Sequence, residues 1–325
     1  MKQRTLGRQG LTVSALGYGA MGISLAYGPS DENEGIATIR RAHELGVTFF
    51  DTAELYGQGE NERIVGAALA PHTRRGRHRD QVRLRLHRHQ RRRCRQPSRA
   101  HPRGRRRRPA PPRRRRHRRA LPAPRRPQRA HRGRGGDGQG VRRRRQGPLL
   151  RAERGGGANT IRRAHAVQPV SVLQTEYSLF ERDVESLFPV LRELGIGFVA
   201  YSPLGRGFLT GQAKPGAEYD PTDMRSWDAR FQPGNYEKNL EATQRLADLA
   251  AAKDATVAQL ALAWLLAQGD DIVPIPGTRS PRRLEENVAA ATLTLDDADL
   301  KRIAEILPTG GFGARYPDPL LPTWD

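Results

Sequence analysis

The sequence predicts an α/β fold, with helices covering a parallel sheet, and at this size a (β/α)8 barrel of the TIM type. Three observations predict it. Segments whose apolar residues have helical spacing alternate with short, almost continuously apolar segments, as buried parallel strands require. The chain has 325 residues, enough for one large domain. It has no obvious linker to a second domain. Periodicity alone does not separate a barrel from an open doubly wound sheet.

The first elements have clear boundaries. Residues 31–46 begin with Asp31 and, three positions later, Glu34, a pattern typical of a capped helix. Residues 47–53 follow as an apolar run rich in β-branched and aromatic residues, which predicts a buried strand. Residues 60–70 again have helical spacing.

The same alternation resumes in the second half of the chain. The predicted strands are residues 171–177, 197–202 and 271–277. The predicted helices are residues 184–195, with a bend at Pro189, and residues 256–268, 281–291 and 296–307.

A basic segment, residues 72–156, interrupts the pattern. Between His72 and Arg154 the chain carries 34 Arg, no Lys and three acidic residues, a net charge of +31. The other residues carry 23 basic and 31 acidic side chains, a net charge of −8 within the total of +23. Arg and Pro cannot bury a core, so we expect this segment to be disordered on its own. We therefore expect one domain, residues 1–325, in which the basic segment replaces strands three to five.

The compartment is predicted from composition. A single cysteine, Cys94, excludes an intramolecular disulfide and suits a reducing compartment. The start of the chain lacks the apolar core of a signal peptide, and no apolar run approaches the length of a membrane span. We expect a cytoplasmic protein with no membrane partner.

Polar residues gather where the predicted strands end, which is where barrel enzymes hold their active sites. Asp51 follows the apolar run of one strand, and Tyr56 lies in the loop behind it. Gln174, Tyr201 and Ser202 lie near the ends of two later strands. Each has a simpler interpretation: the aspartate as a helix or turn cap, and the tyrosines as packing. It is their joint pattern that favours a functional site.

Four motifs resemble, in family order, segments of the aldo-keto reductases. They are LGYGAMG from Leu16, FFDTAELYGQGENERIVGAAL from Phe49, FVAYSPLGRGFLTG from Phe198 and IPGTRSPRRLEENVAA from Ile275. The resemblance covers residues 1–71 and 157–325, and it is to bacterial, NADPH-dependent members. A Rossmann-type GxGxxG motif is absent from the sequence, which agrees with NADPH binding on a barrel.

The resemblance implies an oxidoreductase that reduces a small aldehyde or ketone to an alcohol with NADPH. Asp51 and Tyr56 would be catalytic, Tyr201 would stack under the nicotinamide ring, and no metal would be needed. Residues 278–283 would hold the 2′-phosphate, although the same arginines could simply be a solvated helix start. The implied cofactor-binding residues are Gly19, Met21, Gln174, Tyr201, Ser202, Leu204, Gly277, Thr278, Arg279, Arg283, Glu286 and Asn287.

The family's catalytic set adds a lysine and a histidine, and these would fall within the basic segment. Carbonyl reduction needs a proton donor, and a free tyrosine with a pKa of about 10 is a reluctant one at neutral pH. A neighbouring ammonium lowers that pKa, an aspartate pairs with the ammonium, and the histidine orients the carbonyl. Residues 72–154 contain no lysine and no obvious strand, so this part departs from the family pattern.

A change of reading frame would explain the basic segment. Codons can be chosen so that a one-base shift of residues 79–83 reads Ala-Thr-Lys-Phe-Gly, like the family's lysine strand. The same shift of residues 120–128 gives LYQHRVDP, like its histidine strand, and residues 146–156 give KVRYFGLSEA, like its fifth strand. Our hypothesis is a frame shift near His72 that is reversed near Gly156, either in the gene or in its reading.

Two other functions are compatible with the sequence. An arginine-rich nucleic-acid-binding protein would explain the charge, but the segment lacks interleaved aromatic residues and recognisable binding motifs. We therefore expect no specific nucleic acid partner. A non-catalytic, cofactor-binding barrel would explain the missing lysine. In the loop after residue 211, Trp227 and Phe231 could line an apolar substrate pocket or anchor the loop, and we favour anchoring.

Overall fold

The structure is a computed structural model that describes residues 1–73, 83–87, 150–151 and 157–316. All of them belong to one unit of the chain, Met1–His89 with Arg145–Asp325. Its strands are β1 (Gln3–Leu6), β2 (Leu11–Ser14), β3 (Tyr18–Gly19), β4 (Phe49–Ala53), β5 (Arg83–His87), β6 (Leu150–Arg151), β7 (Val172–Glu176), β8 (Gly197–Tyr201) and β9 (Ile272–Pro274).

Strands β3 to β9 run parallel. β4 pairs with β3 and β5, while β7 lies between β6 and β8, and β8 pairs with β9. The two groups meet where the Gly17 amide donates to the Pro274 carbonyl (2.9 Å) and the Gly19 amide donates to the Pro276 carbonyl (3.2 Å). The order across the sheet is therefore β5-β4-β3-β9-β8-β7-β6, which is the order of neighbouring strands in a (β/α)8 barrel.

The prediction of an α/β fold with a parallel sheet is confirmed. Within the described ranges the sheet does not close into a barrel, and β5 and β6 are its outermost strands. Residues 88–149, which connect these two strands in the chain, lie outside the described residues.

The expectation that residues 72–154 contain no strand is wrong for two short segments. β5 pairs along its whole length with β4, with Asp51 opposite Arg85, and β6 pairs with β7. The sequence RLRLH of β5 alternates polar and apolar residues, the period of a strand, and β4 offers it a row of backbone partners. Helix α2 also extends to Thr73, just inside the basic segment.

An antiparallel hairpin of β1 and β2 lies at the amino ends of β7 and β8, away from the candidate site. The Arg8 amide donates to the Gly195 carbonyl over 2.7 Å. Gly7 has φ of +65°, and a Cβ there would come within 2.4 Å of the same carbonyl oxygen. The sequence analysis did not predict this hairpin.

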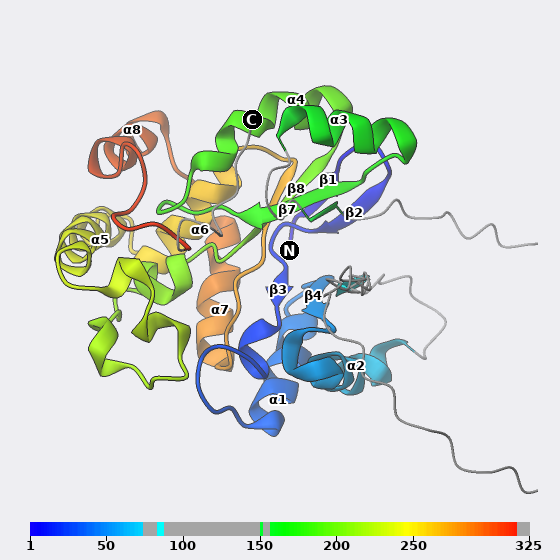
Figure 1. Cartoon of the computed structure of the whole chain (residues 1–325), viewed down its shortest axis with the longest axis horizontal. Helices are drawn as coiled ribbons and strands as arrows, with labels where there is room; N and C mark the ends of the chain where they lie inside the picture. Colours follow the sequence, from blue (N-terminus) through cyan, green and yellow to red (C-terminus); the bar gives the residue numbers. More distant parts are fainter. Residues whose placement is uncertain (74–82, 88–149, 152–156, 317–325) are drawn as a thin grey trace, which may run out of the picture. The chain divides into compact units, whose positions relative to one another are not determined.

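Helices flank the strands in the order expected of βα units (Figure 1). Asp31 caps the first helix and accepts hydrogen bonds from the amides of Asn33 (2.6 Å) and Glu34 (3.1 Å), as predicted. Pro189 does not bend a helix: it lies in the first turn of one that follows a 3₁₀ turn. The helices are α1 (Glu32–Glu44), α2 (Glu60–Thr73), α3 (Ala158–Val167), α4 (Phe188–Leu194), α5 (Asn235–Ala251), α6 (Val257–Ala267), α7 (Pro281–Ala289) and α8 (Asp297–Ile306).

The core is divided by the faces of the strands. Phe49, with Val199 and Val273, belongs to a buried cluster on the inner face of the sheet, which the hairpin residue Leu6 also joins. Phe50, the next residue, belongs instead to a cluster with α1 and α2. Consecutive residues of β4 thus point to opposite faces of the sheet.

Candidate functional site

Asp51 lies on β4 and is only 4% exposed. The side-chain amide of Gln174, on β7, donates to its Oδ2 over 3.1 Å, although the two residues are 123 positions apart. The Asp51 carbonyl accepts a hydrogen bond from the Ala20 amide, in the loop after β3, over 2.9 Å. The structure therefore brings together a predicted catalytic residue and a predicted cofactor-binding residue.

Tyr56 follows β4 and opens a 3₁₀ turn, Tyr56–Gly59, in which it is half-buried. The next two residues, Gly57 and Gln58, both have left-handed backbone angles, with φ of 62° and 57°. Left-handed angles are costly for a residue such as Gln58, and such strain is often concentrated at functional sites. The turn therefore fixes the position of the Tyr56 backbone.

Asn61, at the start of α2 just after this turn, was not predicted from the sequence. Its side chain is fully buried, and its Oδ1 accepts from the Thr52 hydroxyl over 2.6 Å. Its Nδ2 donates to the Ala20 carbonyl over 2.8 Å and to the Ser24 hydroxyl over 2.9 Å. One amide side chain thus links β4, the loop after β3 and the helix that follows Tyr56. Its neighbours in sequence are charged surface residues, which gave no signal of burial.

Tyr201 ends β8, and its hydroxyl lies 3.2 Å from the hydroxyl of Tyr316. Burial, with smaller contributions from neighbours that include Tyr316, raises the pKa of Tyr201 well above the ordinary tyrosine value. Ser202 follows with a left-handed φ of 49°, and Leu204, which is 9% exposed, precedes the 3₁₀ turn Gly205–Thr210. This neutral, fixed tyrosine ring suits a flat stacking partner.

Gly19 and Gly277 face each other where β3 passes the segment after β9. A Cβ at Gly277 would lie 2.7 Å from the Gly19 carbonyl oxygen, so neither side has room for a side chain. The Tyr18 hydroxyl donates to the Thr278 carbonyl over 2.6 Å and fixes the same seam. Met21 begins the 3₁₀ turn Met21–Ile23 directly after β3. Glycine is needed at both positions because the two backbones pack directly against each other.

The two predicted phosphate-binding arginines hold different loops. Arg279 donates to the Tyr27 carbonyl over 3.0 Å and so anchors the loop after β3. Arg283 lies in the first turn of α7, which Ser280 caps, and donates to Gln212 Oε1 over 2.8 Å. A capped helix start that carries an arginine fits an anionic phosphate. Of the two arginines, Arg283 is therefore the one placed at a helix start that could hold a phosphate.

The last two predicted cofactor residues also lie on α7. Glu286 Oε1 accepts from the Thr256 hydroxyl over 2.7 Å, and Asn287 is 5% exposed. Among the predicted residues, direct contacts join Asp51 to Gln174 and bring Gly19 against Gly277.

The aromatic residues of the loop after β8 have different surroundings. Phe231 is fully buried, with ring centroids of Phe208 at 5.1 Å and Tyr219 at 5.7 Å. Anchoring is confirmed for this residue. Trp227 is 55% exposed, so it does not anchor the loop and that prediction is wrong for it.

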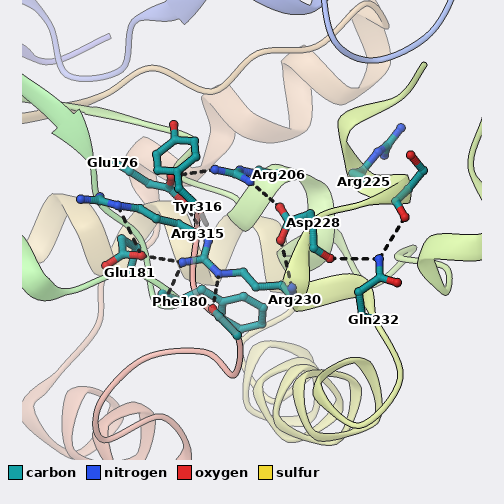
Figure 2. Close-up of polar contacts among 12 residues, drawn as sticks. Glu176, Phe180, Glu181, Arg206, Arg225, Asp228, Arg230, Gln232, Arg315 and Tyr316 are labelled. Atoms are coloured by element: carbon teal, nitrogen blue, oxygen red, sulfur yellow. Dashed lines mark hydrogen bonds and ion pairs between the residues drawn. The ribbon is translucent and has the colours of Figure 1, made fainter. Parts of the chain in front are cut away.

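Three buried arginines lie at the carboxyl ends of β7 and β8, paired with carboxylates (Figure 2). Arg206 Nη1 lies 2.5 Å from Asp228 Oδ2, and its Nη2 lies 3.4 Å from Glu176 Oε2. Arg230 Nη1 lies 2.7 Å from Glu176 Oε1. We call this group the arginine cluster; its members are Arg206, Arg230, Arg315, Glu176, Glu181 and Asp228.

The arginine cluster joins distant parts of the chain. Glu181 accepts from Arg230 over 2.6 Å, and its Oε2 lies 3.9 Å from Arg315 Nε in the carboxyl-terminal segment. Burial acts to raise the pKa of Glu176, but Arg230 and Arg206 together hold it below its usual value. Each arginine side chain is 1% exposed. The sequence analysis missed the whole cluster, because its members are spread over the second half of the chain without a repeating pattern.

The described ranges contain no group of three His, Cys, Asp or Glu side chains placed to hold a metal ion. In the same ranges no helix has the length and apolar character needed to cross a membrane.

Comparison with known proteins assigns this chain to a family. A sequence model of the aldo/keto reductase family matches residues 15–107 and 155–308. A probable aldo-keto reductase 1 of Glycine max is 37% identical over 325 residues, covering 96% of this chain and 90% of that protein. The aldo-keto reductase yakc of Schizosaccharomyces pombe, whose name specifies NADP(+), is 35% identical and covers 94% and 92%. The chain belongs to the aldo/keto reductase family, whose members reduce carbonyl groups to alcohols with NAD(P)H.

Solved structures agree on the fold. A glycerol dehydrogenase of Gluconobacter oxydans superimposes with a TM-score of 0.66 at 21% identity, covering 99% of this chain and 98% of that one. The holo form of an aldo-keto reductase of Bacillus halodurans gives a TM-score of 0.60 at 21% identity, covering 97% and 98%.

The expected lysine and histidine are not placed by the structure. Residues 79–82 and 120–128, where the shifted frame would read these strands, lie outside the described residues, as do residues 146–149 and 152–156. The family match itself passes over residues 108–154, all of which belong to the basic segment. The frame-shift hypothesis stays a prediction.

Proposed function

We propose that the site at the carboxyl ends of β4, β7 and β8 reduces a small aldehyde or ketone with NADPH. The observation that carries the proposal is the buried contact between Asp51 and Gln174, 3.1 Å long. It joins the motif that carries Asp51 and Tyr56 to β7, in the second half of the chain, which carries a predicted cofactor-binding residue. The hydrogen bonds of Asn61, on the helix after Tyr56, join that helix to β4 and to the loop after β3.

Tyr56 is the proton donor in this proposal. A carbonyl that receives hydride on carbon needs a proton on oxygen, and the phenol would supply it. NADPH supplies the hydride when bound. Asp51 is buried on the strand that precedes the Tyr56 loop, and its carboxyl group would pair with a cation that makes Tyr56 a better acid.

The cofactor would lie along the seam between β3 and the segment after β9. Tyr201 would contact the nicotinamide ring, with Gln174 and Ser202 beside it. Arg283 and the start of α7 would hold the 2′-phosphate, which is what favours NADPH over NADH.

Replacing Tyr56 tests the assignment of the acid. In a chain with the reductase frame restored, we expect Tyr56→Phe to lower kcat by roughly 10²- to 10⁴-fold, the usual worth of a general acid. NADPH binding should change little. Tyr236→Phe is the control, because it removes a hydroxyl whose hydrogen bond, to the Ala213 carbonyl, is made from α5. An unchanged kcat in Tyr56→Phe would discard this assignment.

The chain that keeps the basic segment tests a second part of the proposal, which concerns turnover. Because residues 72–154 contain no lysine, we propose that this chain binds NADPH but turns over slowly, as a cofactor-binding barrel would. Sequencing the locus and assaying both chains side by side measures the difference. Equal turnover by the printed and the frame-restored chains would contradict this part.

A further inference from the structure

The carboxyl-terminal segment returns to the end of β8. The Gly311 amide donates to the Phe180 carbonyl over 3.0 Å, and a Cβ at Gly310 would lie 2.9 Å from that oxygen. Two hydrogen bonds of 2.8 Å join the backbone of Phe312 to the side chain of Asn239. The segment therefore has a defined path up to Tyr316, and it does not lie loosely on the surface.

Two arginines of the arginine cluster lie against the ring of Tyr316 (Figure 2). The guanidinium carbon of Arg206 lies 4.9 Å from the ring centroid, and that of Arg315 lies 5.9 Å from it. Arg206 cannot move away easily, since Glu176 and Asp228 both bind its guanidinium. Its backbone has φ of 58°, an angle that a non-glycine residue keeps only when its surroundings enforce it.

The hydroxyl of Tyr316 reaches Tyr201, to which the proposed function assigns the contact with the nicotinamide ring. It lies 3.2 Å from the hydroxyl of Tyr201, within hydrogen-bond distance. A tyrosine ring is held at its Cβ by the backbone, and a hydrogen bond at the opposite end fixes the direction of its long axis as well. That direction decides where the ring lies relative to a flat partner.

We propose that Tyr316 is a positioning residue, which the arginine cluster holds in place so that its hydroxyl fixes the ring of Tyr201 for the nicotinamide. The inference rests on the proposed function, in which Tyr201 contacts that ring. The carboxyl-terminal segment thereby contributes to cofactor affinity without touching the reacting atoms.

A double-mutant cycle tests the pair through NADPH binding to the full chain, measured by fluorescence titration and independent of turnover. Tyr316→Phe keeps the ring over Arg206 and removes the hydroxyl. We expect it to raise the Kd for NADPH about 3- to 10-fold, the worth of one neutral hydrogen bond. Tyr201→Phe should do the same, and the double variant should be no worse than either single one. Tyr236→Phe should leave the Kd unchanged.

Different outcomes separate this inference from the proposed function. If Tyr201→Ala raises the Kd but Tyr316→Phe does not, the positioning role is overturned and the nicotinamide contact stands. Additive effects in the double variant would also overturn it. If Tyr201→Ala leaves the Kd unchanged, the assigned contact of Tyr201 fails and the inference fails with it. Melting temperatures of the variants, compared with wild type, exclude unfolding as the cause of a weaker Kd.

Discussion

At the carboxyl ends of β7 and β8, buried arginines are paired with carboxylates, whereas at the end of β4 the amide side chains of Asn61 and Gln174 make the hydrogen bonds. The first region holds residues assigned to the cofactor. The second holds Asp51 and Tyr56, and the other two members of their expected set fall within the basic segment. The difference teaches that, in the proposed function, the residues assigned to the nicotinamide and those assigned to proton transfer have different kinds of polar partners.

The largest effect is expected from breaking the arginine cluster. Glu176→Ala leaves Arg206 and Arg230 buried without their shared carboxylate, and losing one partner of a buried ion pair costs about 3–5 kcal/mol. Denaturant unfolding measures the change. The control is Glu193→Ala, which removes an exposed partner of Arg162 and should change stability little. If both variants lowered the free energy of unfolding by the same small amount, the buried ion pairs would stabilise the fold no more than an exposed one does.

The pH dependence of stability follows from the same residue. The pKa of Glu176 is lowered in the folded chain, so its contribution is present above the unfolded value of about 4.5 and is lost as pH falls through the folded value. We expect the free energy of unfolding to decrease below pH 4.5, and to decrease less steeply in Glu176→Gln. Denaturant unfolding between pH 3 and pH 7 measures it; identical slopes would contradict the assignment.

Arg283→Ala tests the cofactor side. Losing one charge-assisted hydrogen bond should weaken NADPH binding about 10- to 100-fold. The Kd for NADH, which lacks the 2′-phosphate, should stay the same. Arg282→Ala, the neighbouring exposed residue, is the control for the loss of a positive charge. A parallel loss of affinity for both cofactors would show that Arg283 does not recognise the phosphate.

The smallest change in stability is expected from a variant near the amino terminus. Asp31→Ala removes the cap of α1 and should cost about 1 kcal/mol of unfolding free energy. The control is Asp297→Ala, which leaves Asp296 as the cap of α8. NADPH binding should be unchanged in both variants. A large loss of NADPH affinity in Asp31→Ala would mean that the two sides of the site are coupled.

Local signals were sufficient for much of the fold. The cap at Asp31 and the apolar run that ends near Asp51 lie within a few residues of the elements they define, and both are confirmed. The hairpin of β1 and β2 was missed because its strands are four residues long and mostly polar. β5 was missed because the composition of its surroundings outweighed the alternation in RLRLH.

The site was less predictable, since its geometry depends on contacts that no local pattern encodes. Arg206 and Glu176 are 30 positions apart, and the Tyr201 hydroxyl meets a residue 115 positions away. The role of Arg279 in anchoring the loop after β3 also depends on a contact across 252 positions. A resemblance to a family supplies residue types, but not which of them touch.

Contacts at and near the seam between β3 and β9 join parts of the chain that the basic segment separates. Residues before the basic segment meet residues after it through the Gly17–Pro274 hydrogen bond, the Asp51–Gln174 contact and the Arg41–Glu285 ion pair of 2.8 Å. None of these contacts involves the basic segment. We therefore expect two polypeptides cut within that segment to associate through these contacts.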